Sequence, residues 1–237
     1  MSKFTKIADF KLPELPYRMV KGDYDFSKQA VIDGNIKMLK SIKNNYGTLI
    51  KKWADVFELG EPVLSSFIAV ESGGKMVGKN SAGAMGLTQV TYVSVIECVS
   101  KFKTITSQDL PEDFVSLLKA KAPYLLKITP NNQTISSTDK AKLEKLLVSD
   151  ANFNIAMGAL SLRWILELTK AKGLSYLHKG IIGYNAGSYG RISAYKNQFV
   201  SADALFKDSK LLKETRNYIV QVLGKNGFME LYVKNNI

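Results

Sequence analysis

The sequence predicts a mainly α protein built as a single domain. Apolar residues recur at three- to four-residue spacing in several segments, and neither strand-like alternation nor internal repeats are evident. Hydrophobic residues make up 46% of the 237 residues, enough to bury a core. A chain of this length suits one domain with an elaboration better than two complete domains.

The N-terminal part of the chain predicts an extended arm followed by two helices. Pro13 and Pro16 indicate that residues 1–27 are extended. Residues 27–45 carry apolar side chains at helical spacing, with lysines elsewhere on the circumference, and therefore predict an amphipathic surface helix. We expect a second helix from about Gly47 to Glu58.

Two further helices are predicted in the polar, lysine-rich segment 100–150, which we interpret as an elaboration on the core. One follows Pro111 in EDFVSLLKAK, and the other begins with capping-type residues in SSTDKAKLEKLLVSD. A broad apolar face predicts a central helix from Asn152 to Thr169, and further helices are expected at about 174–184 and 209–223. The expected parts of the chain are an arm with an amphipathic helix (1–45), a core domain with its elaboration (46–225) and a C-terminal tail (226–237).

One predicted helix ends in an acid where an apolar residue is expected. Pro62 opens this helix, and Glu71 takes the next position on its apolar face. Gly73 and Gly74 end the helix, so Glu71 lies in the last turn, at the negative end of the helix dipole. Burial and the dipole both disfavour a carboxylate, so we expect a raised pKa and a role as general acid. The alternative is a buried glutamate that pairs with a lysine or caps a neighbouring loop.

The segment after this helix, SAGAMGLTQ, is suited to close contact with a ligand. Its small residues let the backbone approach another group, and Gln89 adds a neutral hydrogen-bonding side chain. Together, Glu71, Ser72 and this segment resemble the catalytic signature of the soluble lytic transglycosylases. GYNAG (183–187), NIAMGALSLRWIL and ETRNYIVQVL (214–223) resemble the other motifs of that family.

The resemblance implies a lysozyme-like helical domain that cleaves the β-1,4 bond between N-acetylmuramic acid and N-acetylglucosamine in peptidoglycan. Glu71 is then the sole general acid and base, aided by the substrate's own N-acetyl group, and the muramic acid 6-hydroxyl closes a 1,6-anhydro ring. No metal or cofactor is implied. The residues implied to bind or orient substrate are Ser72, Gln89, Tyr184, Asn185 and Tyr218.

Alternatives exist for these residues and for the reaction. Tyr184, implied to orient Glu71 or the N-acetyl group, and Tyr218 are also suited to plain core packing. Thr88 stands where the family commonly has methionine, a departure that affects sugar contacts. No second acid is assigned to the site, and an additional acid there would favour a muramidase that uses Glu71 with water as the nucleophile.

Composition limits the choice of partner. Cys98 and His178 are the only residues of their kinds, which excludes an intramolecular disulfide and the usual His/Cys metal cluster. The net charge of +12 favours an anionic partner, which we take to be peptidoglycan strands and wall polymers rather than nucleic acid. A virion structural or binding protein that retains the fold is a rival from another class.

The sequence also suggests a setting. No apolar run approaches the roughly 20 residues that span a bilayer, and the N-terminus lacks the apolar stretch of a secretory signal. We therefore expect a bacteriophage protein, carried in the virion or released at lysis, that acts on peptidoglycan in the bacterial periplasm or cell wall. Residues 1–45 and 100–150 are the segments expected to contact other virion or cell-wall-complex proteins.

Overall fold

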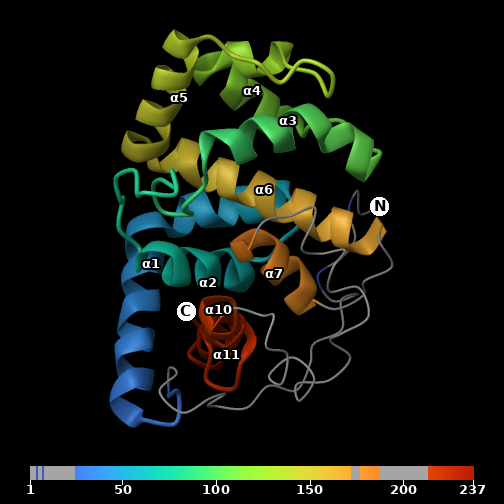
Figure 1. Cartoon of the computed structure of the whole chain (residues 1–237). Coiled ribbons are helices and arrows are strands. Elements are labelled where there is room, and N and C mark those ends of the chain that lie inside the picture. The colour runs from blue at the N-terminus through green and yellow to red at the C-terminus, as the bar shows by residue number, and fades with distance from the viewer. Residues whose placement is uncertain (1–3, 5–6, 8–24, 172–176, 187–212) are drawn as a thin grey trace.

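The computed structural model describes residues 4, 7, 25–171, 177–186 and 213–237, and every regular element in this part of the chain is a helix (Figure 1). The mainly α prediction is therefore confirmed. The elements are α1 (Gln29–Val56), α2 (Glu61–Ser72), α3 (Tyr92–Thr106), α4 (Glu112–Lys121), the short 3-10 helix η2 (Pro123–Lys127), α5 (Ser137–Ser149), α6 (Ala151–Ala171), α7 (Leu177–Ala186), α10 (Lys213–Leu223) and α11 (Phe228–Lys234).

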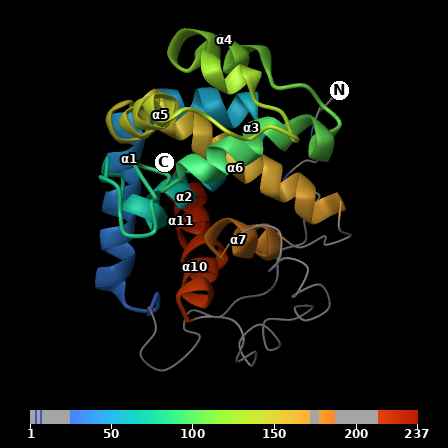
Figure 2. The ribbon, with the colours of Figure 1, turned by 45° about the horizontal axis from the view of Figure 1, so that its top comes forward.

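α6 is the central element, as predicted. It crosses the middle of the molecule with α3 along one side and α7 along the other (Figures 1 and 2). Nearly every residue from Phe153 to Thr169 is buried, so the helix is covered around its whole circumference. The cluster of buried apolar residues around it is continuous and includes residues from all the long helices. The described chain therefore forms one core.

The structure has one long helix, α1, where two separate helices were predicted, so that prediction is wrong. α1 runs unbroken for 28 residues through Gly47, and the boundary expected between residues 45 and 46 falls inside it. A glycine in a helix interior costs about 1 kcal/mol relative to alanine. Packing of α1 on α2, α6 and α11 offsets this cost, with Ile42, Ile50 and Trp53 buried in those contacts.

Arg163 of α6 closes the C-terminal end of α1. Its side chain is fully buried and donates hydrogen bonds to the backbone oxygens of Phe57 (2.8 Å) and Glu58 (2.6 Å). These bonds satisfy carbonyls that the end of a helix leaves without partners. Phe4 lies over the guanidinium, 5.2 Å from ring centroid to Cζ, so the beginning of the expected arm is anchored on the core. Residues 8–24 of the arm lie outside the described part of the chain.

The segment 100–150 contains the two predicted helices, α4 and α5. Both lie beyond α3 in the upper part of Figure 1, and Phe114, Leu118, Leu143 and Leu147 are completely buried. The elaboration therefore extends the same hydrophobic core.

α3 was not predicted. It begins with a capping box in which the Thr91 side chain accepts from the Ser94 N–H and the Ser94 hydroxyl accepts from the Thr91 N–H. Serine at the third position is a weaker signature than the usual Glu or Gln, so the start of this helix is hard to see in sequence.

The C-terminal tail is also helical. α11 packs against α2 and α1, and its Phe228, Leu231 and Tyr232 are buried. Lys43 of α1 donates to the Glu61 carboxylate (2.7 Å) and the Tyr232 hydroxyl (3.1 Å), which joins three helices. The segment expected to form a C-terminal tail is therefore packed on the core.

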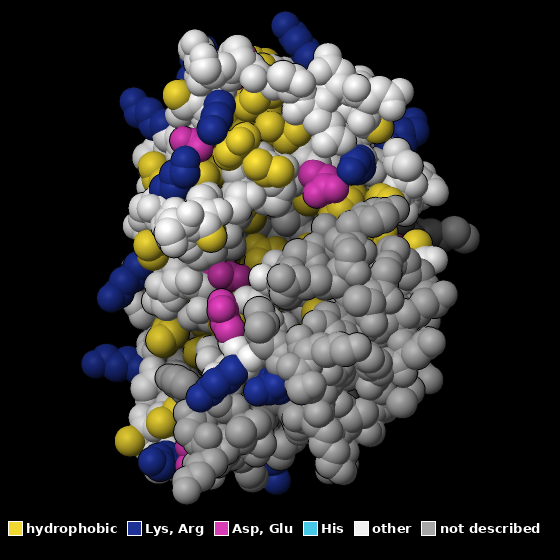
Figure 3. Space-filling model, in the orientation of Figure 1, with side chains coloured by type: hydrophobic (Ala, Val, Ile, Leu, Met, Phe, Trp, Pro, Cys, Tyr) yellow, Lys and Arg dark blue, Asp and Glu magenta, His cyan; other side chains and the backbone are white. Residues whose placement is uncertain are grey.

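The described surface is rich in lysine. In Figure 3, Lys and Arg side chains lie around the outline of the face shown, and acidic side chains also occur nearer its middle. Within the described ranges, none of the helices combines the length and the apolar character needed to cross a membrane.

Candidate active site

Glu71 lies at the end of α2, as predicted. Gly60, at φ 79°, precedes the helix, and Gly73 ends it in the left-handed conformation at φ 61°. Every residue from Val63 to Ala69 is buried, whereas Glu71 in the last turn is only partly buried. The helix thus brings one carboxyl group from the core to the edge of a cavity.

The cavity has a volume of about 780 Å³ and is lined by residues of α2, α3, α6, α7, α10 and the loop between α2 and α3. Its size falls within the range of about 300–1,000 Å³ that is usual for small-molecule sites. Five of the six residues proposed from sequence to form the site line it: Glu71, Gln89, Tyr184, Asn185 and Tyr218.

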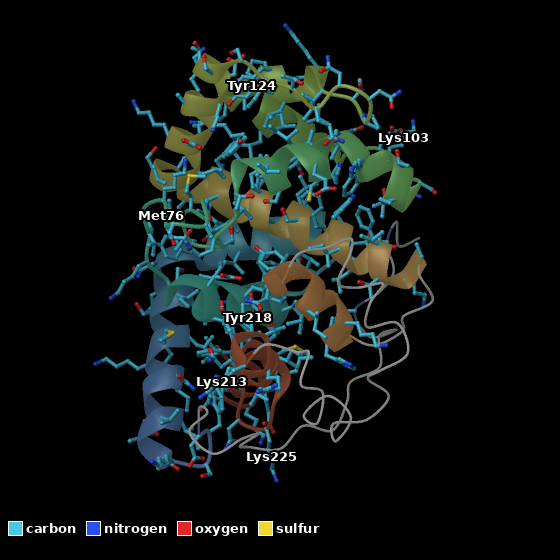
Figure 4. All side chains as sticks on the ribbon, viewed as in Figure 1. Met76, Lys103, Tyr124, Lys213, Tyr218 and Lys225 are labelled. Carbon is cyan, nitrogen blue, oxygen red and sulfur yellow. The ribbon has the colours of Figure 1, made fainter. Side chains whose placement is uncertain are left out.

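The environment of Glu71 favours its protonated form. The pKa of this carboxyl is raised to about 7, because burial and, to a smaller extent, the negative charge of Glu214 raise it by more than a hydrogen bond from Tyr218 lowers it. The Tyr218 hydroxyl lies 2.6 Å from Oε1 of Glu71. Tyr218 is labelled in Figure 4, between α2 and α10. A carboxyl group with a pKa near neutrality can give up and regain a proton at physiological pH, as general acid–base catalysis requires.

The two site tyrosines make different contacts. The hydroxyl of Tyr218 on α10 donates to Glu71, whereas that of Tyr184 on α7 donates to the backbone oxygen of Thr88 at 2.8 Å. Both rings pack edge-on against Phe67 of α2, at centroid distances of 5.8 and 4.9 Å. Burial raises the pKa of each phenol well above its usual value, so both remain hydrogen-bond donors.

Gln89 is held by its own loop. Its side-chain amide donates to the backbone oxygen of Gly86 (2.8 Å) and accepts from the Asn80 amide (3.2 Å). Asn80 in turn accepts from the backbone N–H groups of Ala82 and Ala84, both at 2.9 Å. The loop therefore presents two ordered amide side chains to the cavity.

The side chains of Ser72 and Asn185 each form a hydrogen bond that connects two parts of the fold. The Ser72 hydroxyl donates to the backbone oxygen of Leu87 (2.8 Å), tying the end of α2 to the loop, and Ser72 is not among the described residues that line the cavity. Asn185 accepts from the Thr215 hydroxyl at 2.7 Å, which joins α7 to α10. The sequence predicted that this helix ends at about residue 184, but α7 continues through Ala186; Gly187 lies outside the described residues.

Asn154 is the first residue of the NIAMGALSLRWIL segment, and the sequence analysis gave its side chain no role. It is fully buried in α6, and its amide donates to the backbone oxygens of Met85 (3.0 Å) and Leu147 (2.9 Å). Its carbonyl oxygen accepts from the backbone N–H and the hydroxyl of Thr88, both at 2.9 Å. This one side chain fixes the loop that carries Gln89. A polar residue on an otherwise apolar helix was the available signal.

Two more acids line the cavity, Glu97 from α3 and Glu214 from α10. Glu97 accepts a hydrogen bond from Lys101 at 2.9 Å, whereas Glu214 is exposed at the beginning of α10. The sequence analysis assigned no second acid to the site, and the structure places two acids in the lining of its cavity. The sequence already indicated one of these acids, because Glu214 is the first residue of the motif at 214–223. Across the described ranges, these acids do not form a cluster that could hold a metal ion.

Cys98 lines the same cavity from α3 and is 2% exposed. Burial raises the pKa of its thiol to about 12. The thiol is therefore a small apolar part of the wall at neutral pH.

Comparison of the chain with protein-family models, with curated proteins and with solved structures finds no match. The case for a function therefore depends on the residues and geometry of the cavity.

Proposed function

We propose that this protein is a lytic transglycosylase, a lysozyme-like enzyme that cleaves the β-1,4 bond between N-acetylmuramic acid and N-acetylglucosamine in peptidoglycan. One observation carries the proposal: Glu71 lines a cavity of about 780 Å³, accepts a hydrogen bond from Tyr218, and has its pKa raised to about 7 by burial. The order of the sequence motifs around this acid supports the same assignment.

In the first step, the protonated Glu71 gives its proton to the glycosidic oxygen, and the bond from that oxygen to C1 of the muramic acid breaks. The acetamido oxygen of the same sugar bonds to C1 and balances the positive charge. In the second step, the Glu71 carboxylate takes the proton of the sugar's 6-hydroxyl. O6 then bonds to C1 as the acetamido oxygen leaves, giving the 1,6-anhydro end and restoring the acid.

The surrounding side chains have matching roles in this scheme. Tyr218 orients Glu71 and stabilises it as a carboxylate between the two steps. Gln89 and Asn185 line the cavity and contribute amide groups that can hydrogen-bond sugar hydroxyls. Tyr184 acts through the loop, because its hydroxyl holds the Thr88 carbonyl next to Gln89.

The test is mass spectrometry of the soluble products released from purified peptidoglycan by the wild type and by the Glu71→Gln variant. We expect the wild type to release products whose muramic acid ends lack one water relative to reducing ends. The variant should release none while retaining the helical circular dichroism spectrum. Full activity in a folded Glu71→Gln protein would exclude the proposed role of this acid.

A second candidate is a hydrolytic muramidase that uses the same acid. It is favoured by Glu214, an exposed carboxylate that lines the cavity and whose charge acts on Glu71. A second carboxylate can activate water for attack on the sugar. Reducing-end products that disappear in a Glu214→Gln variant would favour this reaction. Anhydro products that persist in that variant would exclude it.

The setting follows from the proposed substrate. A bacteriophage protein carried in the virion or released at lysis would meet peptidoglycan in the periplasm or cell wall. The net charge of +12 supports this setting, because anionic wall polymers attract a basic protein. Detection of the chain in purified virions by mass spectrometry would distinguish a virion enzyme from one that is released at lysis.

A further inference from the structure

The cavity offers a substrate no positively charged side chain. Its described lining residues include Glu71, Glu97 and Glu214 but neither a lysine nor an arginine. A carboxylate of the substrate would meet like charges there, which is unfavourable. Peptidoglycan strands carry carboxylates on the peptide stems that are attached to muramic acid. These stems are therefore expected to lie outside the cavity.

One surface at the edge of the cavity has a composition that suits such a stem. Val93 of α3 lines the cavity and is 55% exposed. Tyr92, the first residue of α3, is stacked against Lys140 of α5, with 4.3 Å between the lysine Nζ and the ring centroid. In Figure 3, hydrophobic side chains gather in the upper part of the face shown, where Figure 1 places α3 and α5. We call Tyr92, Val93 and Lys140 the α3/α5 surface.

The ammonium group of Lys140 is available to an anion. Both acids of α5 have other partners. Asp139 lies 3.6 Å from Nζ of Lys142, and Glu144 lies 2.8 Å from Nζ of Lys79. Within the described part of the chain, Lys140 takes part in no ion pair. Stacking on the aromatic ring holds its ammonium group in place, so the surface combines one positioned cation with apolar side chains.

The distance across α3 matches the length of an extended peptide. A helix with its side chains is about 10–12 Å across, and an extended chain covers about 3.3–3.6 Å per residue. A tetrapeptide stem on a sugar in the cavity can therefore cross α3 at Val93 and reach Lys140. Its alanine methyl groups would then pack on Val93 and Tyr92, and a stem carboxylate would meet the ammonium group. A nucleic acid would need several cations along its backbone, whereas this surface supplies one.

We propose that the α3/α5 surface binds the anionic peptide stem of the substrate, with Lys140 pairing with a stem carboxylate and Tyr92 and Val93 packing on alanine methyl groups. The proposal rests on the proposed function, because it takes the strand to be held in the cavity. It gives the segment 100–150 a role in substrate selection. Strands with charged stems should be cleaved faster than strands whose stems are neutral.

The test compares two matched substrates. One is a preparation of uncrosslinked glycan strands with tetrapeptide stems, and the other is the same preparation after its carboxylates have been converted to primary amides. The specificity constant kcat/KM is measured on both for the wild type, Lys140→Gln and Lys140→Glu, and circular dichroism checks that each variant is folded. All soluble products are counted, so the result does not depend on whether their ends are anhydro or reducing.

We expect Lys140→Gln to lower kcat/KM on the charged strands by about two- to fivefold, the range for an exposed ion pair. Lys140→Glu should lower it by about tenfold or more, because it brings like charges together. On the amidated strands, Lys140→Gln should match the wild type. Lys145→Gln is the matched control. It removes the same charge from an exposed residue of the same helix, five positions away and on a different side, and should change neither rate.

The outcomes separate this proposal from the one on which it rests. A loss confined to the charged strands in both Lys140 variants supports the proposal. An equal loss on both preparations would show that Lys140 only supports the fold, and no loss on either would show that the stem lies elsewhere. Both of these results overturn the inference and leave the proposed function intact. If the wild type releases no products from either preparation, the proposed function fails and this inference fails with it.

Discussion

At the scale of single residues, two opposing effects act on Glu71. Burial favours the protonated carboxyl group, and the hydrogen bond from Tyr218 favours the carboxylate. The first step of the proposed reaction needs the proton, so the activity should fall as the pH rises through about 7.

Replacing Tyr218 with Phe should move this decline to higher pH. The hydrogen bond stabilises the charged form, so its loss raises the pKa of Glu71 further. We also expect kcat/KM near neutral pH to fall by about tenfold, because the carboxyl group is no longer oriented. The measurement is a pH–rate profile on solubilised glycan. Tyr232→Phe, which removes a hydroxyl from α11, should leave the profile unchanged; a Tyr218→Phe profile that coincides with it would contradict the assigned role.

Glu71 should also lower the stability of the protein above neutral pH. Its folded pKa of about 7 lies above the ordinary value of 4.5, so the folded state binds its proton more tightly than the unfolded state. The resulting stabilisation is fully present below about pH 4.5 and is lost as the pH rises through 7. At pH 8, Glu71→Gln should therefore have a free energy of unfolding about 3 kcal/mol higher than the wild type, and should unfold at a higher urea concentration.

At pH 4 the same two proteins should unfold at similar urea concentrations. Glu230→Gln supplies a control of opposite sign, because hydrogen bonds from Lys234 and Asn226 outweigh burial and lower the pKa of Glu230. That variant should lose stability at pH 8. A Glu71→Gln protein less stable than the wild type at pH 8 would show that the carboxylate is satisfied by its surroundings.

The sequence predicted Glu71 as a candidate general acid because this acid interrupts an apolar helix face just before two glycines. It did not predict that Tyr218, rather than Tyr184, bonds to this acid. Tyr184 lies at the end of one predicted apolar face and Tyr218 within another, and only the packing of α7 and α10 against Phe67 decides which hydroxyl reaches the carboxylate. A contact between residues 147 positions apart has no local signature.

At the scale of elements, the loop between α2 and α3 depends on close contact with α6. A Cβ atom on Gly86 would lie 2.0 Å from the Asn154 amide nitrogen and 2.4 Å from the Leu147 backbone oxygen, and Gly86 has a φ of 75°. The loop can therefore approach Asn154 only with glycine at this position.

Gly86→Ala should consequently lower the free energy of unfolding by about 3 kcal/mol or more, because it combines a clash with an unfavourable φ and displaces Asn154. The activity should fall as well, since the loop also carries Gln89. Gly78→Ala is the matched control in the same loop, where a Cβ atom would meet nothing within 4 Å. Its stability should stay within about 1 kcal/mol of the wild type. Equal urea midpoints for the two variants would refute the close contact.

The predicted helix boundaries agree with the structure where proline or glycine marks the end of a helix in the sequence. Pro62 and Gly73 lie at the two ends of α2, and Pro111 directly precedes α4. Prediction failed where tertiary packing overrides local preference. Gly47 lies inside α1 because that helix is packed on both sides of it, and the tail beyond residue 225 is helical because Phe228 has a core to enter.

At the scale of the whole molecule, the net charge and the cavity contribute to substrate binding in different ways. The net charge of +12 acts over distances that salt shortens, whereas contacts inside the cavity are short and largely unaffected by salt. The spacing of apolar residues was sufficient to predict a single helical domain, and composition was sufficient to predict the basic surface. It was not sufficient to predict that an anchored Phe4 and the C-terminal helix complete the core, since both are long-range contacts.

Raising the salt concentration from about 50 mM to about 500 mM should weaken the adsorption of the protein to insoluble peptidoglycan by at least tenfold. The measurement is a pull-down with purified sacculi. Binding of neutral chitotetraose to the Glu71→Gln protein serves as the internal reference and should change by less than about twofold, because the probe carries no charge. Salt-independent adsorption to sacculi would mean that the basic surface has no part in substrate capture.

The environment of Cys98 has a consequence for redox chemistry. Oxidation and thiol–disulfide exchange proceed through the thiolate, and a thiol with a pKa of about 12 is ionised in only about one molecule in 10⁵ at neutral pH. The chain has no second cysteine with which to form an intramolecular bridge. The same fold can therefore persist in reducing and oxidising surroundings, without covalent dimers or oxidised sulfur accumulating at its one thiol.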